Sequence, residues 1–223
     1  MPGQPMTAAP DPTSTTTPPA PPAPLAPAIL DGVRVLDLTR IVAGPWCTQT
    51  LADLGAEVLK IEAGRYPDWW RGMNWTQAFI DGQDHEKATI FCGMNRGKQG
   101  ISVDLTTATG RDLALRLVAG ADAVIENQAA GVMAKFGLDY ESLSALNPRL
   151  IYCSNSGFGQ DGPYAARAGY DFIVQGLSGI MDLTGEPADA PQKIGVALAD
   201  IVTGLYAVIG IQAALTRRER TGQ

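Results

Sequence analysis

The chain has 223 residues, of which 45% are hydrophobic and 18% charged, and its formal net charge is −6. This size and composition allow one sizeable core or two small domains, and the acidic balance argues against a broad electrostatic grip on nucleic acid. No apolar run of about 18 residues stands out, so the sequence predicts no membrane span. We therefore expect a globular protein that holds any anionic ligand through local contacts.

Residues 1–28 are rich in Pro, Ala and Thr and lack the basic start and apolar core of a secretory signal, which predicts a disordered leader before a fold at residues 29–223. Three cysteines, Cys47, Cys92 and Cys153, stand singly without metal-ligand spacing. We interpret them as buried thiols of a protein in a reducing, cytoplasmic compartment, with neither a disulfide framework nor a metal site.

Strand-like and helix-like segments alternate along the rest of the chain. Helical apolar spacing at residues 46–56, 106–121 and 139–147 separates runs that are typical of strands, which are residues 32–38, 57–62, 101–105, 122–126 and 150–156. Such alternation predicts an α/β fold with a Rossmann-like, open, mostly parallel sheet flanked by helices. No GxGxxG motif follows the first strand, which weakens a dinucleotide-binding assignment.

Three loops follow predicted strands at their carboxyl ends, at residues 39–45, 127–135 and 157–171. Ligands of open α/β sheets bind beyond these ends, so we expect the three loops to meet around a site. A fourth long loop, residues 65–87, carries Trp69, Trp70, Trp75 and the single histidine, His85. These tryptophans either stack on a ligand or, as we favour, pin the loop to the body, and His85 is interpreted as solvated.

A glycine-rich stretch leads into a carboxylate at the start of an apolar, helix-like segment. Gly157, Gly159 and Gly162 allow backbone N–H groups to approach a ligand, and Asp171 follows them. An ionised carboxylate at a helix start can act as a nucleophile, but Asp is equally at home there as a helix cap. Residue types alone favour the cap and leave the catalytic alternative open.

The final segment, residues 196–220, reads as a long helix that is apolar on nearly every side. Such a helix must be covered on every side. We expect the missing cover to come from residues absent from this chain or from a second subunit.

From about Leu30 onward the sequence resembles the N-terminal half of the class III CoA-transferases, which include the formyl-CoA, carnitine and bile-acid-inducible CoA-transferases. The resemblance rests on several blocks in the family's order and spacing: GVRVLDLTRIVAGPWCTQTLADLGAEVLKIE, MNRGKQGISVDL, ADAVIENQAAGVMAKFGLDYESL, NPRLIYCSNSGFGQDGPYAARAGYD and IVTGLYAVIGIQAALTRRERTGQ. It implies that this is the N-terminal part of a large domain, incomplete relative to the family, and that full-length members form homodimers or that a complementing subunit is needed.

The resemblance implies that Asp171 is the nucleophile of CoA transfer from an acyl-CoA donor to a carboxylic acid. The carboxylate forms an acyl anhydride and then an aspartyl-CoA thioester, with acyl-CoA as substrate and no permanently bound cofactor. Backbone N–H groups at Gly157, Gly159 and Gly162 are candidates to stabilise the oxyanion. The implied CoA contacts are Val42, Ala43, Asn127, Gln128, Lys135 and Phe158.

Formyl-CoA transferase has a glutamine where this chain has Val42, which argues against formyl or oxalyl specificity.

Two alternatives to a CoA-transferase stay open. An α-methylacyl-CoA racemase shares the fold but needs a second acid–base group, supplied in racemases by a histidine upstream of the aspartate, and none lies between Asp122 and Asp171. A noncatalytic CoA-binding fragment or subunit is the second alternative.

Overall fold

The computed structural model of the chain describes residues 27–65, 67–71, 88–187 and 190–222. Its centre is a five-stranded parallel sheet in the order β3-β2-β1-β4-β5, which confirms the predicted Rossmann-like α/β fold. The strands are β1 (Arg34–Leu38), β2 (Glu57–Glu62), β3 (Gln99–Ser102), β4 (Ala123–Glu126) and β5 (Ile151–Ser154). The predicted leader up to residue 26, Trp75 and His85 lie outside the described residues.

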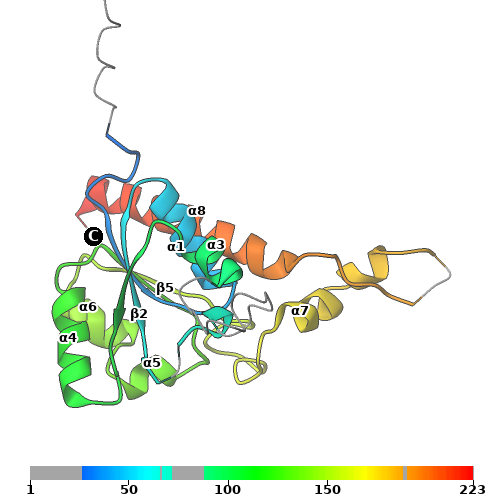
Figure 1. Cartoon of the computed structure of the whole chain (residues 1–223), viewed down its shortest axis with the longest axis horizontal. Helices are drawn as coiled ribbons and strands as arrows, with labels where there is room; N and C mark the ends of the chain where they lie inside the picture. Colours follow the sequence, from blue (N-terminus) through cyan, green and yellow to red (C-terminus); the bar gives the residue numbers. More distant parts are fainter. Residues whose placement is uncertain (1–26, 66, 72–87, 188–189, 223) are drawn as a thin grey trace, which may run out of the picture.

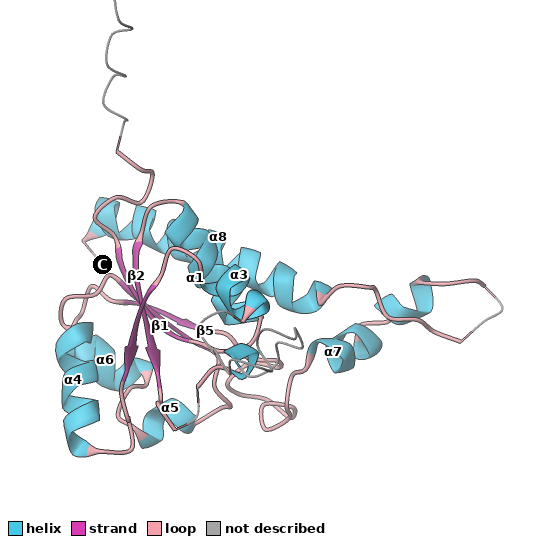
Figure 2. Cartoon of the chain, viewed as in Figure 1, coloured by secondary structure: helices cyan, strands magenta, loops and turns pink. Residues whose placement is uncertain are grey.

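Helices cover both faces of the sheet (Figures 1 and 2). On one face lie α1 (Ala43–Asp53), α3 (Thr89–Asn95) and α8 (Leu198–Thr221). On the other lie α4 (Ala108–Val118), α5 (Val132–Lys135) and α6 (Tyr140–Leu146). The remaining helical elements are η1 (Trp69–Arg71), α7 (Asp171–Leu177) and η3 (Ile180–Leu183). Figure 1 shows α7 and the segment after it extending away from the sheet before the chain returns as α8.

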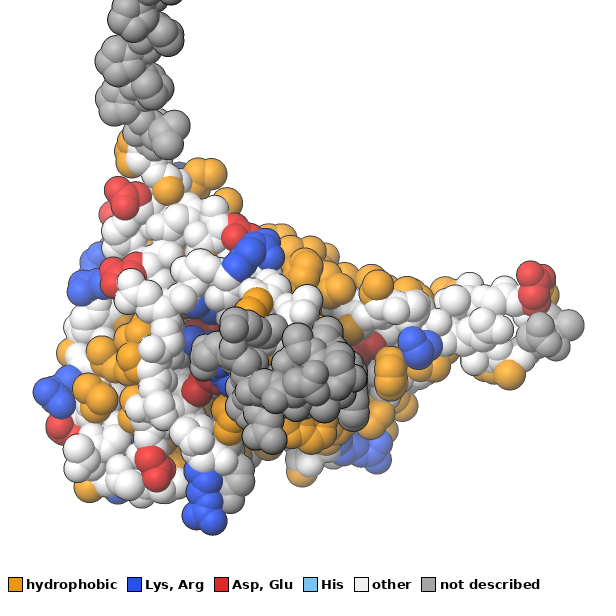
Figure 3. Space-filling view, viewed as in Figure 1, with side chains coloured by type: hydrophobic (Ala, Val, Ile, Leu, Met, Phe, Trp, Pro, Cys, Tyr) orange, Lys and Arg blue, Asp and Glu red, His pale blue; other side chains and the backbone are white. Residues whose placement is uncertain are grey.

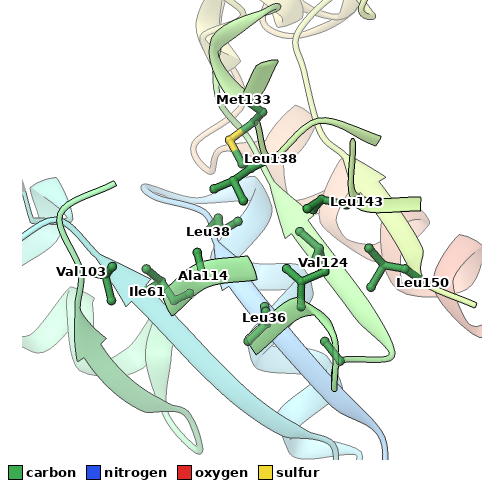
Figure 4. Close-up of a cluster of buried hydrophobic side chains, with 12 residues drawn as sticks. Leu36, Leu38, Ile61, Val103, Ala114, Val124, Met133, Leu138, Leu143 and Leu150 are labelled. Carbon is green, nitrogen blue, oxygen red and sulfur yellow. The ribbon is translucent and has the colours of Figure 1, made fainter. Parts of the chain in front are cut away.

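Two hydrophobic clusters fill the spaces between the sheet and its helices. Successive strand side chains point to opposite faces, so Val35 joins the cluster under α1 and α8, whereas Leu36 joins the cluster under α4, α5 and α6. In the second cluster Leu38, Val124 and Leu143 are buried close together (Figure 4). Both faces of the sheet are therefore shielded from solvent, as is typical of a parallel sheet.

The ends of the strands and helices follow local hydrogen bonds more closely than they follow the apolar pattern of the sequence. Strand 57–62 lies where the sequence predicts it. Helix α4 begins at the N-cap Thr107, whose side chain accepts a hydrogen bond from the Gly110 N–H. The third strand is Gln99–Ser102 rather than 101–105, because the chain turns at Asp104, whose carboxylate accepts the Thr106 N–H at 2.9 Å. Helix α3 was not predicted.

Helix α8 is long and apolar enough to cross a membrane by length and composition, so the expectation that no such segment exists is wrong. One such helix is weak evidence for a membrane, because core helices have the same composition. One side of α8 is buried through Gly204, Val208, Ile211 and Leu215, and α8 packs along α1. The other side exposes hydrophobic side chains (Figure 3).

None of the three cysteines forms a disulfide. Cys47 is buried and Cys153 half-buried, whereas Cys92 is exposed, which corrects the prediction that all three are buried. Burial raises the pKa of the Cys153 thiol to about 11 and that of Cys47 further, so neither is a reactive thiolate near neutral pH. Among the described residues no group of three or more His, Cys, Asp or Glu side chains is placed to hold a metal ion.

Candidate active site

A cavity of about 370 Å³ lies at the carboxyl ends of β1 and β4, where the strand order reverses. Its walls are residues 41–43, 127–130, 155–157 and 165–170, joined by Val174 of α7 and by Ala199, Asp200 and Thr203 of α8. The three loops that were predicted to meet therefore do meet. The reversal point leaves a crevice because the connections from β1 and β4 leave the sheet toward opposite faces.

Asp171 lies behind this cavity rather than in its wall. Its side chain is 8% exposed, and its Oδ2 accepts the amide of buried Gln175 at 2.6 Å. Its Oδ1 accepts the backbone N–H groups of Ala199 at 2.8 Å and of Asp200 at 3.3 Å. Tyr170 is the N-cap of α7, so Asp171 caps the start of α8 instead of its own helix. Asp171 thus stands next to the wall formed by Tyr170 and Val174, and its role as the nucleophile stays a prediction.

Asp200 is the carboxylate that lines the cavity. It lies in the first turn of α8 and is half-buried, and among the described residues no hydrogen bond to its carboxylate oxygens is found. Burial, reinforced by the negative charge of Asp171, raises the pKa of Asp200 to about 6. Sequence reasoning missed this residue because it lies within a helix-like apolar run, where a single Asp near the start reads as a favourable first-turn charge.

Two glycines bring the walls of the cavity together. A Cβ added at Gly157 would lie 2.2 Å from the Cα of Gly169, so the backbone touches at the two ends of the loop of residues 157–171. Gly159 and Gly162 have φ of 86° and 89°, values that favour glycine, but they lie outside the cavity wall. Of the three predicted oxyanion-supporting glycines, only Gly157 is therefore placed to act at the site.

Substituting Gly157→Ala is expected to lower the free energy of unfolding by about 1–3 kcal/mol, because two backbones must separate to admit one methyl group. Urea unfolding followed by tryptophan fluorescence measures the change. Gly210→Ala is the control, because a Cβ at Gly210 of α8 meets no atom within 4 Å and alanine favours helix. A Gly157→Ala protein as stable as the parent would show that the backbone at residues 157 and 169 can separate without a loss of stability.

The predicted CoA contacts divide into two groups. Val42, Ala43, Asn127 and Gln128 all line the cavity. Two other predicted contacts do not: Lys135 ends α5, and the ring of Phe158 packs edge-on against Tyr164 with centroids 5.7 Å apart.

Two unpredicted side chains add polar groups to the wall. The Nδ2 of Asn155 is buried and has no hydrogen-bond partner among the described atoms, which leaves a donor available to a ligand. Arg167 is the one cation among the described lining residues.

Beneath the loop at residues 39–41 lies a buried cluster of charges. Asp37 accepts hydrogen bonds from Thr39 and Thr48, and its Oδ2 is 2.9 Å from the Nζ of Lys98. Burial alone would raise the pKa of Asp37, but the charges of Lys60 and Lys98 and the two hydroxyl groups hold it below its ordinary value. Asp37 therefore remains ionised at neutral pH and holds the backbone N–H and the hydroxyl of Thr39, at the start of the first loop.

A second hollow, of about 460 Å³, lies beside β2 and β3 and is lined in part by Lys60, Glu62, Arg71 and Lys98. Arg71 forms an ion pair with Glu62 at 2.6 Å. Neither Asp171 nor Asp200 lines this hollow, which is therefore distinct from the cavity described above.

The chain is similar to known proteins over most of its length. The succinate–glutarate CoA-transferase of Agrobacterium fabrum is 53% identical over 196 residues, which cover 87% of this chain and 48% of that protein. The human succinyl-CoA:glutarate CoA-transferase is 40% identical over 194 residues, covering 87% and 43%. The crystal structure of a CaiB/BaiF family protein from Brucella suis is 56% identical and has a TM-score of 0.82, covering 89% of this chain and 52% of that one.

The chain spans about half the length of these relatives. The model of a single family, described as CoA-transferase family III, matches residues 30–223, which include every strand of the sheet and the whole cavity wall. The sequence resemblance is thereby confirmed, and the chain belongs to CoA-transferase family III.

Proposed function

We propose that this chain supplies the CoA-transferring site of an enzyme that moves coenzyme A from an acyl-CoA to a carboxylic acid. The observation that carries the proposal is a half-buried carboxylate, Asp200, in the wall of a cavity at the crevice of a family III fold. Named relatives use succinate, glutarate, mesaconate or oxalate, so we propose a dicarboxylic acid as acceptor. The cation Arg167 in the same wall suits a substrate with a second carboxylate.

The proposed reaction proceeds through the carboxylate of Asp200. It attacks the thioester carbonyl of the donor, the C–S bond breaks, and an aspartyl anhydride and CoA thiolate result. The thiolate then attacks the aspartyl carbonyl, which releases the donor acid and forms an aspartyl-CoA thioester. The acceptor carboxylate attacks this thioester to give a new anhydride, and the returning thiolate forms the acceptor's CoA thioester and regenerates Asp200.

The surroundings of Asp200 support this assignment over the predicted nucleophile, Asp171. The described protein donates no hydrogen bond to the carboxylate of Asp200, whereas three donors hold the carboxylate of Asp171 and lower its nucleophilicity. Asp171 instead holds the backbone of Ala199 and Asp200 and so orients the first turn of α8. Gly157 lines the same wall, and we propose that backbone N–H groups near it stabilise the oxyanion.

The test is to incubate the protein with succinyl-CoA and to measure its intact mass, followed by addition of glutarate. A CoA or acyl adduct that disappears with formation of glutaryl-CoA supports transfer. Binding of CoA without any adduct supports the noncatalytic module. Exchange of the α-proton of a 2-methylacyl-CoA with deuterated solvent, without an adduct, supports the racemase alternative.

The rate of adduct formation is expected to depend on the ionisation of Asp200. Because its pKa is about 6 and only the carboxylate attacks, the rate should fall about tenfold per pH unit below 6 and level off above 7. The reaction is quenched at fixed times between pH 4.5 and 8, and the intact mass gives the rate of adduct formation at each pH. A flat profile between pH 5 and 7 would contradict a nucleophile with this pKa.

We also propose that the exposed apolar side of α7 and α8 is covered in the assembled enzyme. Phe172, Leu177, Leu205 and Ile209 are each at least partly open to solvent there. A second copy of the chain, or a complementing chain that supplies the rest of the relatives' length, is the proposed cover. Light scattering at increasing concentration distinguishes a homodimer from a monomer.

A further inference from the structure

The loop between β1 and α1 is held by side chains at nearly every backbone polar group. The carbonyl of Thr39 accepts the Nζ of buried Lys60 at 2.8 Å. The N–H of Arg40 donates to Asn127 Oδ1 at 2.9 Å, and its carbonyl accepts the Nδ2 of the same residue at 2.7 Å. This loop therefore has one fixed course, set by residues from β2 and from the end of β4.

Ile41 takes the most unusual conformation in this loop. Its φ is 72°, and no other non-glycine residue among those described has a positive φ. A β-branched side chain strongly disfavours this left-handed region, so surrounding contacts must hold the residue there. Two residues do so, because the N–H of Ile41 donates to both carboxylate oxygens of Asp68 at 3.3 Å and its carbonyl accepts Trp70 Nε1 at 2.7 Å.

These two residues, here called the Ile41 clamp, are themselves anchored. Asp68 is buried, and its Oδ2 lies 3.4 Å from the Nζ of Lys60. Its backbone N–H donates to Glu62 Oε1 at 2.9 Å, which ties residue 68 to the end of β2. The clamp therefore transfers the rigidity of the sheet to Ile41.

The turn at Ile41 directs the next residues into the proposed active site. Ile41, Val42 and Ala43 form one stretch of the cavity wall, and Val42 is the N-cap of α1. We infer that Asp68 and Trp70 are positioning residues of the proposed CoA transfer, because they hold Ile41 in the left-handed conformation that places Val42 and Ala43 in the wall shared with Asp200. This inference rests on the proposed function, and neither residue lines the cavity itself.

Trp70→Phe tests the clamp by removing the indole N–H while keeping an aromatic ring. Amide hydrogen exchange in the peptide covering residues 39–47 should become at least about tenfold faster, because the carbonyl of Ile41 loses its donor. Trp69→Phe is the matched control, since Trp69 is 66% exposed. Unchanged exchange in Trp70→Phe would overturn the inference whether or not the protein forms an adduct.

A second substitution separates positioning from general support of the fold. In Trp70→Phe, adduct formation with succinyl-CoA should slow by about 10-fold to 100-fold, as expected for a misplaced wall. Glycine adopts a positive φ without strain, so in an Ile41→Gly background the same change should slow it only about 2-fold to 3-fold. Equal effects in both backgrounds would show that Trp70 acts only on the fold.

The two proposals fail in different ways. A parent protein that exchanges slowly at residues 39–47 but forms no adduct would refute the proposed function and leave the clamp in place. A parent protein that forms the adduct, with a rate insensitive to Trp70→Phe, would refute the clamp and leave the proposed function in place.

Discussion

Asp200→Asn is expected to abolish covalent capture of the acyl or CoA group, lowering the rate of adduct formation by about 10⁴-fold or more. The amide keeps the size of the side chain but cannot attack a thioester. The same change should raise the free energy of unfolding at pH 7 by about 1–2 kcal/mol, because the carboxylate pays a burial penalty that raises its pKa to about 6 from an ordinary 3.8. Loss of the adduct in a more stable protein excludes unfolding as the cause.

Asp171→Asn is the matched control for this experiment. Its amide oxygen can still accept the N–H groups of Ala199 and Asp200, so the adduct should still form, about 10-fold to 100-fold more slowly. The acid limb of the rate profile should move to lower pH, because the charge of Asp171 contributes to the raised pKa of Asp200. The reverse pattern, with the adduct lost in Asp171→Asn and kept in Asp200→Asn, would restore Asp171 as the nucleophile.

Asp37→Asn is expected to lower the free energy of unfolding by about 3–5 kcal/mol, because the buried Nζ of Lys98 loses the carboxylate that it pairs with at 2.9 Å. Urea titration followed by circular dichroism measures the loss at pH 7. Since the pKa of Asp37 is depressed in the folded state, its contribution is complete above its ordinary value of 3.8 and disappears as the pH falls through the lower folded value. The parent and the variant should therefore converge in stability toward acid pH.

Asp53→Asn is the comparison for a surface charge. Asp53 pairs with Arg96 at 2.5 Å, but both side chains are exposed, so the loss should be within about 1 kcal/mol. Equal losses in the two variants would indicate that water reaches the charges beneath the loop and that Asp37 is not a buried anchor.

The fold followed from the sequence because its pattern is local. Alternating strand and helix periods gave the parallel sheet, and strand 57–62 is bounded as predicted because a charged residue and a helix end flank its apolar run. Strand β3 was displaced because only its pairing with β2, from Leu59 opposite Gln99 onward, decides where it begins. Pairing between distant segments leaves no periodic trace in one sequence.

The site was predictable to the level of its loops and no further. The rule that ligands bind at strand ends located the three loops at residues 39–45, 127–135 and 157–171, and all three contribute to the cavity wall. The rule could not decide between Asp171 and Asp200 as the nucleophile, because both lie in the first turn of a helix. That Asp171 caps the helix of Asp200 depends on how α7 and α8 pack. The raised pKa of Asp200 likewise depends on a burial that no neighbour in sequence reveals.

The contact of α8 with α1 at Gly204 makes that position a spacer for the whole cavity. A Cβ there would lie 2.7 Å from the carbonyl oxygen of Ala43 and 3.1 Å from the ring of Trp46. Ala43 is the last residue of one stretch of the cavity wall, and Asp200 stands one helical turn before Gly204 in another. Any side chain at residue 204 would thus act as a wedge that widens the gap between Asp200 and α1. The activity of variants at this one position therefore measures how closely that gap must be kept.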